Sequence, residues 1–264
     1  MKIKSTIILL LIFLVSLSLT AYADSNYELF RAVEQGDKGE VKDLLGGFFS
    51  GPDADVNSRN YENITPLMRA AYYGRPEIAE ILIEEGAELD LQDDYGYTAL
   101  MYASEQGNLE TLKLLIDEGA DVNLKLSSEA NFYNLNEGVN ALMLAVKENK
   151  FEIVKELLGG SIFGSETEVN SKDSLEYTPL MYALELDRPE IAEYLIDKGA
   201  NVNAVNEHGY TPLIIAIKNQ NLKLIRLLIE NDADKYYVDK YGRLVFSYAE
   251  ETNNNQIIEL MKSK

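Results

Sequence analysis

One pattern of apolar and polar residues repeats along most of the chain. The segment Thr65-Pro66-Leu67-Met68 returns four times in similar form, and each copy has an alanine three positions after its leucine. The further copies begin at Thr98, Asn140, Thr178 and Thr211. An Ile/Leu-rich stretch follows each copy, and stretches such as 77–83 place their apolar residues on one helical stripe. The pattern predicts repeated units of two helices, with degenerate copies at 27–45 and 244–261.

The residues expected at the helix ends agree with this interpretation. The hydroxyl of Thr65 is suited to cap a helix, and Pro66 fits the first helical position, where no N–H partner is needed. A glycine follows the second helical stretch of several units, at Gly86, Gly119 and Gly199. Glycine suits the left-handed conformation that ends a helix. A short extended segment such as 202–205 then leads into a turn at 207–210. Because no single unit buries its own apolar face, stability must come from stacked neighbours.

These residues resemble the ankyrin repeat, whose Thr-Pro-Leu-His-x-Ala signature recurs with a period of about 33 residues. The resemblance implies an all-α solenoid of about seven helix-turn-helix units joined by β-hairpin-like loops. The units would begin near residues 27, 65, 98, 140, 178, 211 and 244. The signature His is replaced here by Met68, Met101, Met143, Met181 and Ile214. Since that His commonly forms hydrogen bonds between neighbouring loops in the family, we expect apolar packing to replace this tie.

A longer period lies on top of the first. The segment Arg75-Pro76-Glu77-Ile78-Ala79-Glu80 returns three units later at 188–193, which indicates tandem duplication of a three-unit block. Short insertions at 48–51 and 162–165 are expected to fold back on the convex side, with a second contact site as the alternative. A longer insertion within 124–139, which contains Phe132 and Tyr133, is either a spacer or an anchor for a partner.

The N-terminal residues have the features of an export signal. Lys2 and Lys4 precede an uncharged apolar run over 7–19, and Ala21-Tyr22-Ala23 matches the small-x-small pattern of signal peptidase sites. The run is shorter than the roughly 20 residues that a membrane span needs. We therefore expect a signal peptide at 1–23, an ankyrin-repeat domain at 24–264, and a periplasmic or secreted product. An uncleaved N-terminal anchor is the alternative.

Charge narrows the choice of partners. The chain has 44 acidic and 24 basic residues, a formal net charge of -20. Nucleic acids and anionic lipids attract basic surfaces, so we expect neither nucleic-acid binding nor membrane binding after cleavage of the signal. The same charge favours a partner protein with a basic patch. Acidity that only keeps an exported repeat protein soluble is the competing interpretation.

Residues suited to catalysis are scarce. The chain has no cysteine and a single histidine, His208, which falls in a predicted exposed turn without a fixed Ser or Cys partner. Phosphate-binding, zinc-protease and calcium-loop motifs do not occur. We therefore expect no catalytic site, no cofactor and no metal site. Acid pairs such as Asp93/Asp94 and Asp232/Asp234 leave one alternative open, an acidic Ca²⁺-responsive structural protein at the cell surface.

The resemblance also implies where a partner would bind. Ankyrin arrays bind proteins on a concave face built from the hairpin tips and the first helices. The corresponding residues here are Tyr61, Tyr72, Tyr73, Asp94, Tyr95, Tyr97, Glu105, Tyr177, Glu185, Glu207, Tyr210 and Tyr241. Tyrosine is favoured at interfaces because it offers a large contact area with a polar tip. We therefore expect a monomeric, non-enzymatic scaffold that binds another protein, although any single tyrosine could instead pack between hairpins.

Overall fold

The computed structural model describes residues 25–46, 54–126, 137–159 and 167–262. In these ranges the chain forms seven successive pairs of helices, numbered here as units 1 to 7. Unit 1 contains a helix over residues 25–35 and α2 (Lys38–Leu45). The other pairs are α3 (Pro66–Tyr72) and α4 (Pro76–Glu84), α5 (Ala99–Gln106) and α6 (Leu109–Asp117), α7 (Ala141–Lys147) and α8 (Phe151–Leu158), α9 (Pro179–Glu185) and α10 (Pro189–Asp197), α11 (Pro212–Lys218) and α12 (Leu222–Glu230), and α13 (Val245–Glu251) and α14 (Asn255–Lys262).

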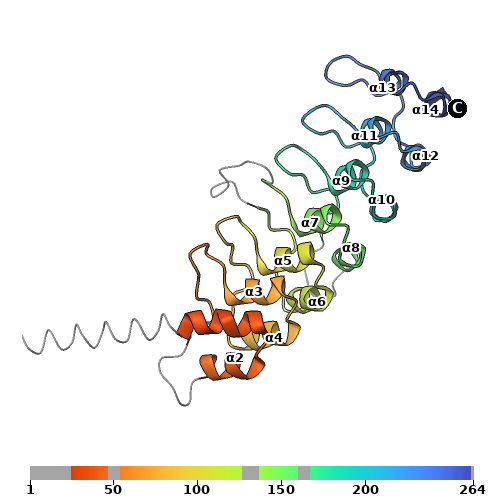
Figure 1. Cartoon of the computed structure of the whole chain (residues 1–264). Helices are drawn as coiled ribbons and strands as arrows, with labels where there is room; N and C mark the ends of the chain where they lie inside the picture. Colours follow the sequence, from red (N-terminus) through yellow and green to blue (C-terminus); the bar gives the residue numbers. More distant parts are fainter. Residues whose placement is uncertain (1–24, 47–53, 127–136, 160–166, 263–264) are drawn as a thin grey trace, which may run out of the picture.

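The units stack side by side as an open array (Figure 1). The first helices α3, α5, α7, α9, α11 and α13 form one row, the second helices form another, and the connecting loops within the described residues project to the same side. In the described residues these loops contain only two isolated antiparallel bridges, Lys125–Asn140 and Val238–Leu244. The expected all-α ankyrin-type solenoid with hairpin-like loops is confirmed.

The repeated sequence signature acts as the helix start that its chemistry predicts. The Thr65 hydroxyl accepts a hydrogen bond from the Met68 backbone N–H at 3.3 Å, and Pro66 occupies the first helical position. Thr98, Asn140, Thr178 and Thr211 cap α5, α7, α9 and α11 in the same way. Unit 7 has a degenerate signature with Leu244 at this position, and its first helix therefore has no side-chain cap.

The residues that replace the signature histidine are fully buried. Met68, Met101, Met143, Met181 and Ile214 are at most 1% exposed and belong to one continuous core. Apolar packing thus takes the place of the signature histidine, and hydrogen bonding between neighbouring loops persists through the backbone. Neighbouring loops are joined by backbone bonds, from Asp94 N–H to the Glu62 carbonyl at 3.1 Å and from Glu207 N–H to the Leu175 carbonyl at 3.0 Å. Backbone groups supply this tie because they do not depend on the residue at the signature position.

A second set of bonds joins successive units near the ends of the second helices. The Asn57 side chain accepts from Glu88 N–H at 2.8 Å and donates to the Gly86 carbonyl at 3.2 Å. Asn170 forms the same pair of bonds with Asn201 and Gly199, and Asn203 forms it with Asp234 and Asp232. We call this arrangement the asparagine latch. Each latch uses one side-chain amide to fix the distance between two adjacent units.

Several sequence expectations fall outside the described residues. The proposed signal peptide at 1–23, the short insertions at 48–51 and 162–165, and Phe132 and Tyr133 of the long insertion belong to this group. Among the helices that the structure describes, none combines the length and the apolar character needed to span a bilayer.

Candidate functional site

The loops and the exposed sides of the first helices form one continuous surface, here called the inner face (Figure 1). All twelve residues that the sequence predicts as partner-binding lie on these loops or first helices. Seven of them are exposed: Tyr61, Tyr72, Tyr73, Tyr95, Glu185, Glu207 and Tyr241. Five are partly buried: Asp94, Tyr97, Glu105, Tyr177 and Tyr210. The two groups have different contacts and therefore different roles.

The partly buried tyrosines are held against the array. The rings of Tyr97, Tyr177 and Tyr210 pack on the hydrophobic core. The Tyr97 hydroxyl also donates to the Glu105 carboxylate at 3.0 Å. Burial, followed by the nearby Glu105 charge, raises the pKa of the Tyr97 hydroxyl above its ordinary value. These three rings are therefore part of the packed array, whereas Tyr61, Tyr95 and Tyr241 of the loop tips are exposed.

Buried aspartates connect the loops of units 3, 5 and 7 to their first helices. One oxygen of Asp93 accepts from the Tyr95 and Tyr97 backbone N–H groups at 2.8 and 2.9 Å, and the other accepts from the Tyr102 hydroxyl at 2.6 Å. Asp173 with Tyr182 and Asp239 with Tyr248 repeat the arrangement, with hydroxyl bonds of 2.5 Å. We call these three pairs the Asp–Tyr ties. They fix the loop tip relative to the helix that follows.

The sequence reasoning missed these pairs, although the sequence contains their signal. Aspartate is followed nine positions later by tyrosine in units 3, 5 and 7. In units 2 and 6 the loop residue is Asn60 or Asn206 instead, and the helix residue is Arg69 or Ile215. Asparagine still accepts the backbone bonds of the turn, as Asn60 does from Glu62 N–H and Ile64 N–H at 2.9 Å. The loop residue therefore changes together with the helix residue that faces it.

Basic side chains cover several of the tyrosine rings in the later units. The ammonium of Lys147 lies 5.3 Å from the Tyr182 ring centre, and that of Lys218 lies 4.2 Å from the Tyr210 ring centre. The Arg243 guanidinium lies 4.0 Å from the Tyr248 ring centre. Cations over aromatic faces at these distances are attracted by the ring quadrupole. Basic side chains of the array itself therefore offset part of the negative charge on the inner face of units 5 to 7.

Lys147 is the most enclosed of these cations. Burial lowers the pKa of its ammonium, while the carboxylates of Asp173, Glu148, Glu105 and Glu185 act in the opposite direction. Four acids from units 3, 4 and 5 thus act on one lysine near the middle of the array. Sequence reasoning did not select Lys147, because a lysine at the end of a short helix usually lies in solvent.

Units 2 and 3 have a tyrosine cluster in place of these cation contacts. The Tyr72 ring lies 5.1 Å from Tyr73 and 5.9 Å from Tyr102 in edge-to-face geometry, and Tyr102 lies 5.0 Å from Tyr97. A cavity of about 130 Å³ beside the cluster is lined by Glu62, Ile64, Met68, Arg69, Tyr72 and Tyr102. A cavity of roughly 150 Å³ holds one benzene molecule, so this one has room for a single side chain.

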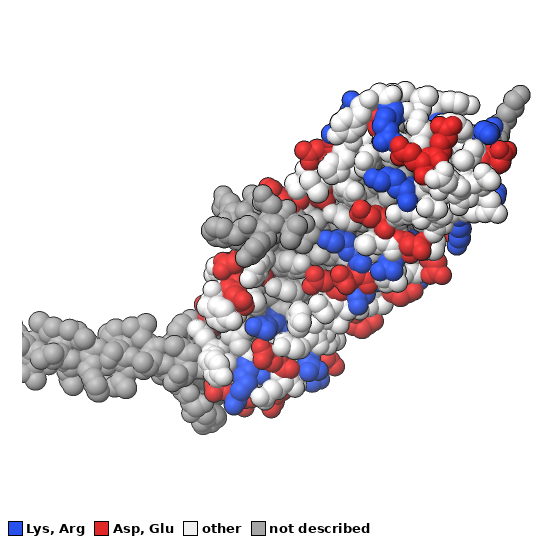
Figure 2. Space-filling view, turned by 45° about the horizontal axis from the view of Figure 1, so that its top comes forward, with Lys and Arg blue, Asp and Glu red and all other residues white. Residues whose placement is uncertain are grey.

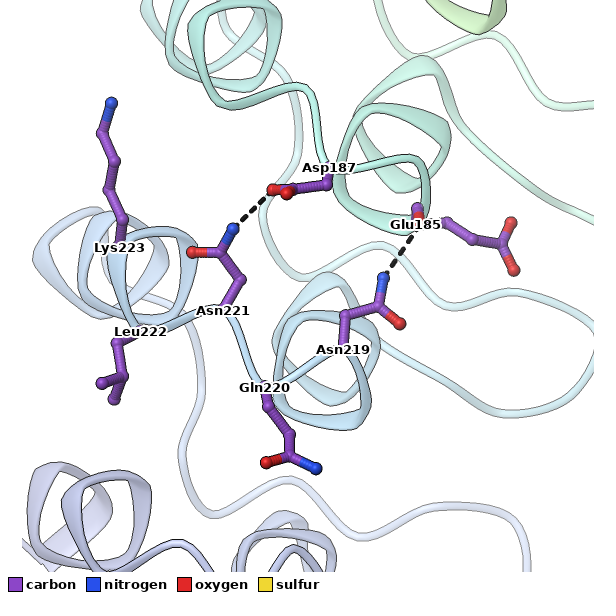
Figure 3. Close-up of a pocket in the computed structure, with 7 residues that line it drawn as sticks. All are labelled: Glu185, Asp187, Asn219, Gln220, Asn221, Leu222 and Lys223. Carbon is purple, nitrogen blue, oxygen red and sulfur yellow. Dashed lines mark hydrogen bonds between the residues drawn. The ribbon is translucent and has the colours of Figure 1, made fainter.

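A larger depression of about 630 Å³ lies between units 5 and 6 (Figure 3). Its lining residues are polar apart from Leu222, and its amides already bind the neighbouring unit. The Asn219 amide donates to the Glu185 carbonyl at 2.9 Å, and the Asn221 amide donates to the Asp187 carboxylate at 2.5 Å. Figure 3 shows Lys223 and Gln220 pointing away from these bonds. The depression is therefore a joint between units more than a ligand site.

The residues considered for metal or catalytic chemistry have other contacts. The carboxylate of Asp93 is occupied by the Asp–Tyr tie, and Asp94 accepts from the Asn63 amide at 2.5 Å. No group of three potential metal ligands occurs in the part of the chain that the structure describes. His208 is exposed, with its ring 6.0 Å from that of Tyr210. In the view of Figure 2, basic and acidic side chains are interspersed over the surface of the array.

These features define an ankyrin-type array, and the sequence comparison agrees with that fold. Residues 29–126 and 124–206 match the family described as ankyrin repeats (3 copies), and residues 195–249 match ankyrin repeats (many copies). The chain belongs to the ankyrin-repeat family. Such domains typically serve as protein–protein interaction scaffolds and are generally non-enzymatic. No curated protein matches the sequence significantly.

Solved structures with the same fold include eukaryotic and bacterial proteins. The ankyrin-repeat domain of human ASB11 is 23% identical, with a TM-score of 0.71, over 89% of this chain and 98% of that one. The ankyrin-repeat domain of Bcl-3, a member of the IkappaB family, is 27% identical, with a TM-score of 0.75 over the same shares. A chain in the complex of the Bd0816 predatory endopeptidase from Bdellovibrio bacteriovorus with immunity protein Bd3460 is 28% identical, with a TM-score of 0.62, over 77% and 97%.

Proposed function

We propose that this chain is an exported, monomeric scaffold that binds another protein through its inner face. The observation that carries the proposal is the row of exposed tyrosines along the loop tips and first helices. Tyr61, Tyr95 and Tyr241 are 88%, 47% and 66% exposed, although each has a large apolar ring. Exposed tyrosines on a rigid support are typical binding anchors, because little side-chain entropy is lost on contact.

The chemistry of the partner follows from the charge of the chain. Its formal net charge of -20 favours a partner with a basic patch, since opposite potentials accelerate encounter and like charges disfavour wrong partners. Export rests on the charged start, the apolar run and the small-x-small site in residues 1–23. The product would then act in the periplasm or outside the cell.

The bacterial structural neighbour supports a second, narrower candidate. A chain that is 28% identical to this one occurs in a complex between an endopeptidase and an immunity protein. An exported array that covers a hydrolase would protect the producing cell from that hydrolase. This candidate uses the same inner face and adds one requirement, that the bound partner be an enzyme whose activity falls on binding.

The proposal is tested by crosslinking capture with the full chain, expressed with its own leader and a C-terminal tag. The test variant carries Tyr61→Ala, Tyr95→Ala and Tyr241→Ala, three exposed positions that leave the core intact. The matched control carries Tyr236→Ala, which is 80% exposed and precedes the Val238–Leu244 bridge that encloses the last loop tip. We expect one protein to be captured by the wild type and the control and lost from the triple variant. Equal capture by all three would contradict binding through the loop tips.

A further inference from the structure

The first helices alternate in the residue that follows their N-cap by seven positions. Units 3, 5 and 7 have Glu105, Glu185 and Glu251 there. Units 4 and 6 have Lys147 and Lys218. Unit 2 belongs to the second series by its place in the array, yet it has Tyr72. One position of the series thus has an aromatic ring where its counterparts have an ammonium group.

The later units show what the cation does at this position. Lys147 reaches from unit 4 to the ring of Tyr182 in unit 5, at 5.3 Å from the ring centre. Tyr102 of unit 3 is the counterpart of Tyr182, and both hydroxyls bind the aspartate of their Asp–Tyr tie. Tyr102 has the Tyr72 ring at 5.9 Å in place of an ammonium. In units 4 and 5 a lysine of the chain itself thus supplies the cation beside the tyrosine ring, whereas in units 2 and 3 a second tyrosine takes the place of that lysine.

The surroundings of Tyr72 and Tyr102 suit a positive charge. Both rings line the cavity of about 130 Å³, together with the carboxylate-bearing Glu62. Arg69 also lines this cavity, but its guanidinium lies 3.3 Å from the Glu34 carboxylate, which offsets its charge. Residues 54–126 contain 15 acidic and 5 basic residues, a net charge of -10. A cation that enters this cavity meets two aromatic rings and the Glu62 carboxylate within an acidic region.

We propose that units 2 and 3 contain a receptor site for one lysine or arginine side chain of the partner protein, in the cavity lined by Tyr72, Tyr102 and Glu62. The proposal rests on the function proposed above and adds the place and the chemistry of the main contact. The apolar walls formed by Ile64 and Met68 suit the methylene stem of such a side chain. Tyr73, which is 40% exposed, is in edge contact with Tyr72.

The direct test is a titration of the full, processed chain with Nα-acetyl-arginine amide, followed by NMR of ring-labelled tyrosines. Nα-acetyl-glutamine amide, which is similar in shape but neutral, is the control ligand, and the chloride concentration is matched. We expect saturable shifts of the Tyr72 and Tyr102 signals with the arginine compound only. Tyr182 and Tyr248, already covered by Lys147 and Arg243, should not shift. Equal responses to both ligands, or equal shifts of all four tyrosines, would overturn the proposal.

A reciprocal exchange sharpens this test. Tyr72→Lys gives unit 2 the cation of units 4 and 6, so arginine binding at Tyr102 should weaken roughly five- to thirtyfold, the range expected for loss of a cation–π contact. Lys147→Tyr should make Tyr182 newly responsive. Tyr72→Phe keeps the ring and should bind like the wild type. Thermal melting by circular dichroism checks that each variant is folded. A folded Tyr72→Lys variant with unchanged binding would refute the site.

The two proposals fail in different ways. If a partner is captured by the wild type and by Tyr72→Lys with equal affinity, the receptor site is wrong and inner-face binding stands. If the tyrosines respond to the arginine compound but no partner depends on Tyr61, Tyr95 and Tyr241, the receptor site stands and the wider proposal is wrong.

Discussion

Units 2 and 3 and units 5 to 7 use one backbone plan to support two different surfaces. Residues 54–126 have a net charge of -10, whereas residues 167–262, with 16 acidic and 10 basic residues, have a net charge of -6. Tyrosine rings contact one another in both regions, but in the later units Lys218 and Arg243 also lie over such rings, whereas Tyr102 in the earlier units has the Tyr72 ring beside it. The Asp–Tyr ties are present in both regions. The comparison shows that the loop framework is independent of the charge that surrounds it.

The turn between the two helices of a unit also differs between the regions. Gly74 and Gly107 occupy it in units 2 and 3 with positive φ, and a β-carbon at either place would lie within 3 Å of the side chain of Asn108 or Lys150. Units 5 and 6 have Asp187 and Gln220 there, with φ of 55° and 54°. The early turns need glycine for conformation and for space, whereas the later turns accept strained side chains.

The largest expected effect comes from breaking the shared framework. Asp93→Ala removes the acceptor of two backbone N–H groups and of the Tyr102 hydroxyl in a buried setting. We expect a loss of about 2–4 kcal/mol in the free energy of unfolding, because buried donors lose their partner. Urea denaturation followed by circular dichroism measures this loss.

Asp93→Asn is the matched control for that variant. Asn60 and Asn206 show that an amide supports the same turn in units 2 and 6, so the asparagine variant should lose less than half as much stability as the alanine variant. If both variants lost the same amount, the tyrosine bond alone would explain the effect, and the turn would contribute little.

The next effect separates the two kinds of turn. Gly74→Ala should destabilise the array by about 1–2 kcal/mol, because alanine is strained at positive φ and its β-carbon would lie 2.7 Å from the Asn108 side chain. Gln220→Gly should stabilise it by about 0.5 kcal/mol, since glycine relieves the same backbone strain. Thermal melts of the two variants measure the sign of each change in stability. A destabilised Gln220→Gly variant would show that the later turns are not strained.

The smallest effect concerns the titration of two equivalent aspartates. Burial and the adjacent Asp94 raise the pKa of Asp93 above its ordinary 3.8. Asp239 is also buried, but bonds from Tyr248 and two backbone N–H groups, together with Arg243, outweigh burial and lower its pKa below 3.8. Asp239 therefore contributes stability that is complete above its unfolded-state pKa and is lost as the pH falls through its folded-state pKa. Ionised Asp93 instead carries a penalty that disappears as the pH falls through its raised pKa.

Carboxyl-carbon NMR measures these two titrations directly. We expect midpoints on opposite sides of 3.8 for Asp93 and Asp239. Arg243→Met should move the Asp239 midpoint upward and leave Asp93 unchanged. Identical midpoints in the wild type would mean that neighbouring charge does not distinguish the two regions.

Local chemistry made most of the fold predictable from the sequence. A Thr-Pro pair starts a helix at Thr65, Thr178 and Thr211. The glycines that end the second helices adopt their positive φ because of local conformational preference alone. The inner face was harder to predict, because the bond between Asp93 and Tyr102 depends on how the loop returns to the helix. For the same reason Tyr97 and Tyr95 looked equivalent, although the first packs on the core and the second is exposed.

The asparagine latch bears on how such a chain grows. Asn57 and Asn170 occupy the same place in the two copies of the duplicated block, and each forms the same two bonds to the unit that follows it. A gene segment copied at this length carries its connectors with it, so the new protein segment needs no compensating mutation to join the old one. Ancestral lengthening of the array by whole blocks would then have been tolerated from the first generation, before selection began to diversify the surfaces.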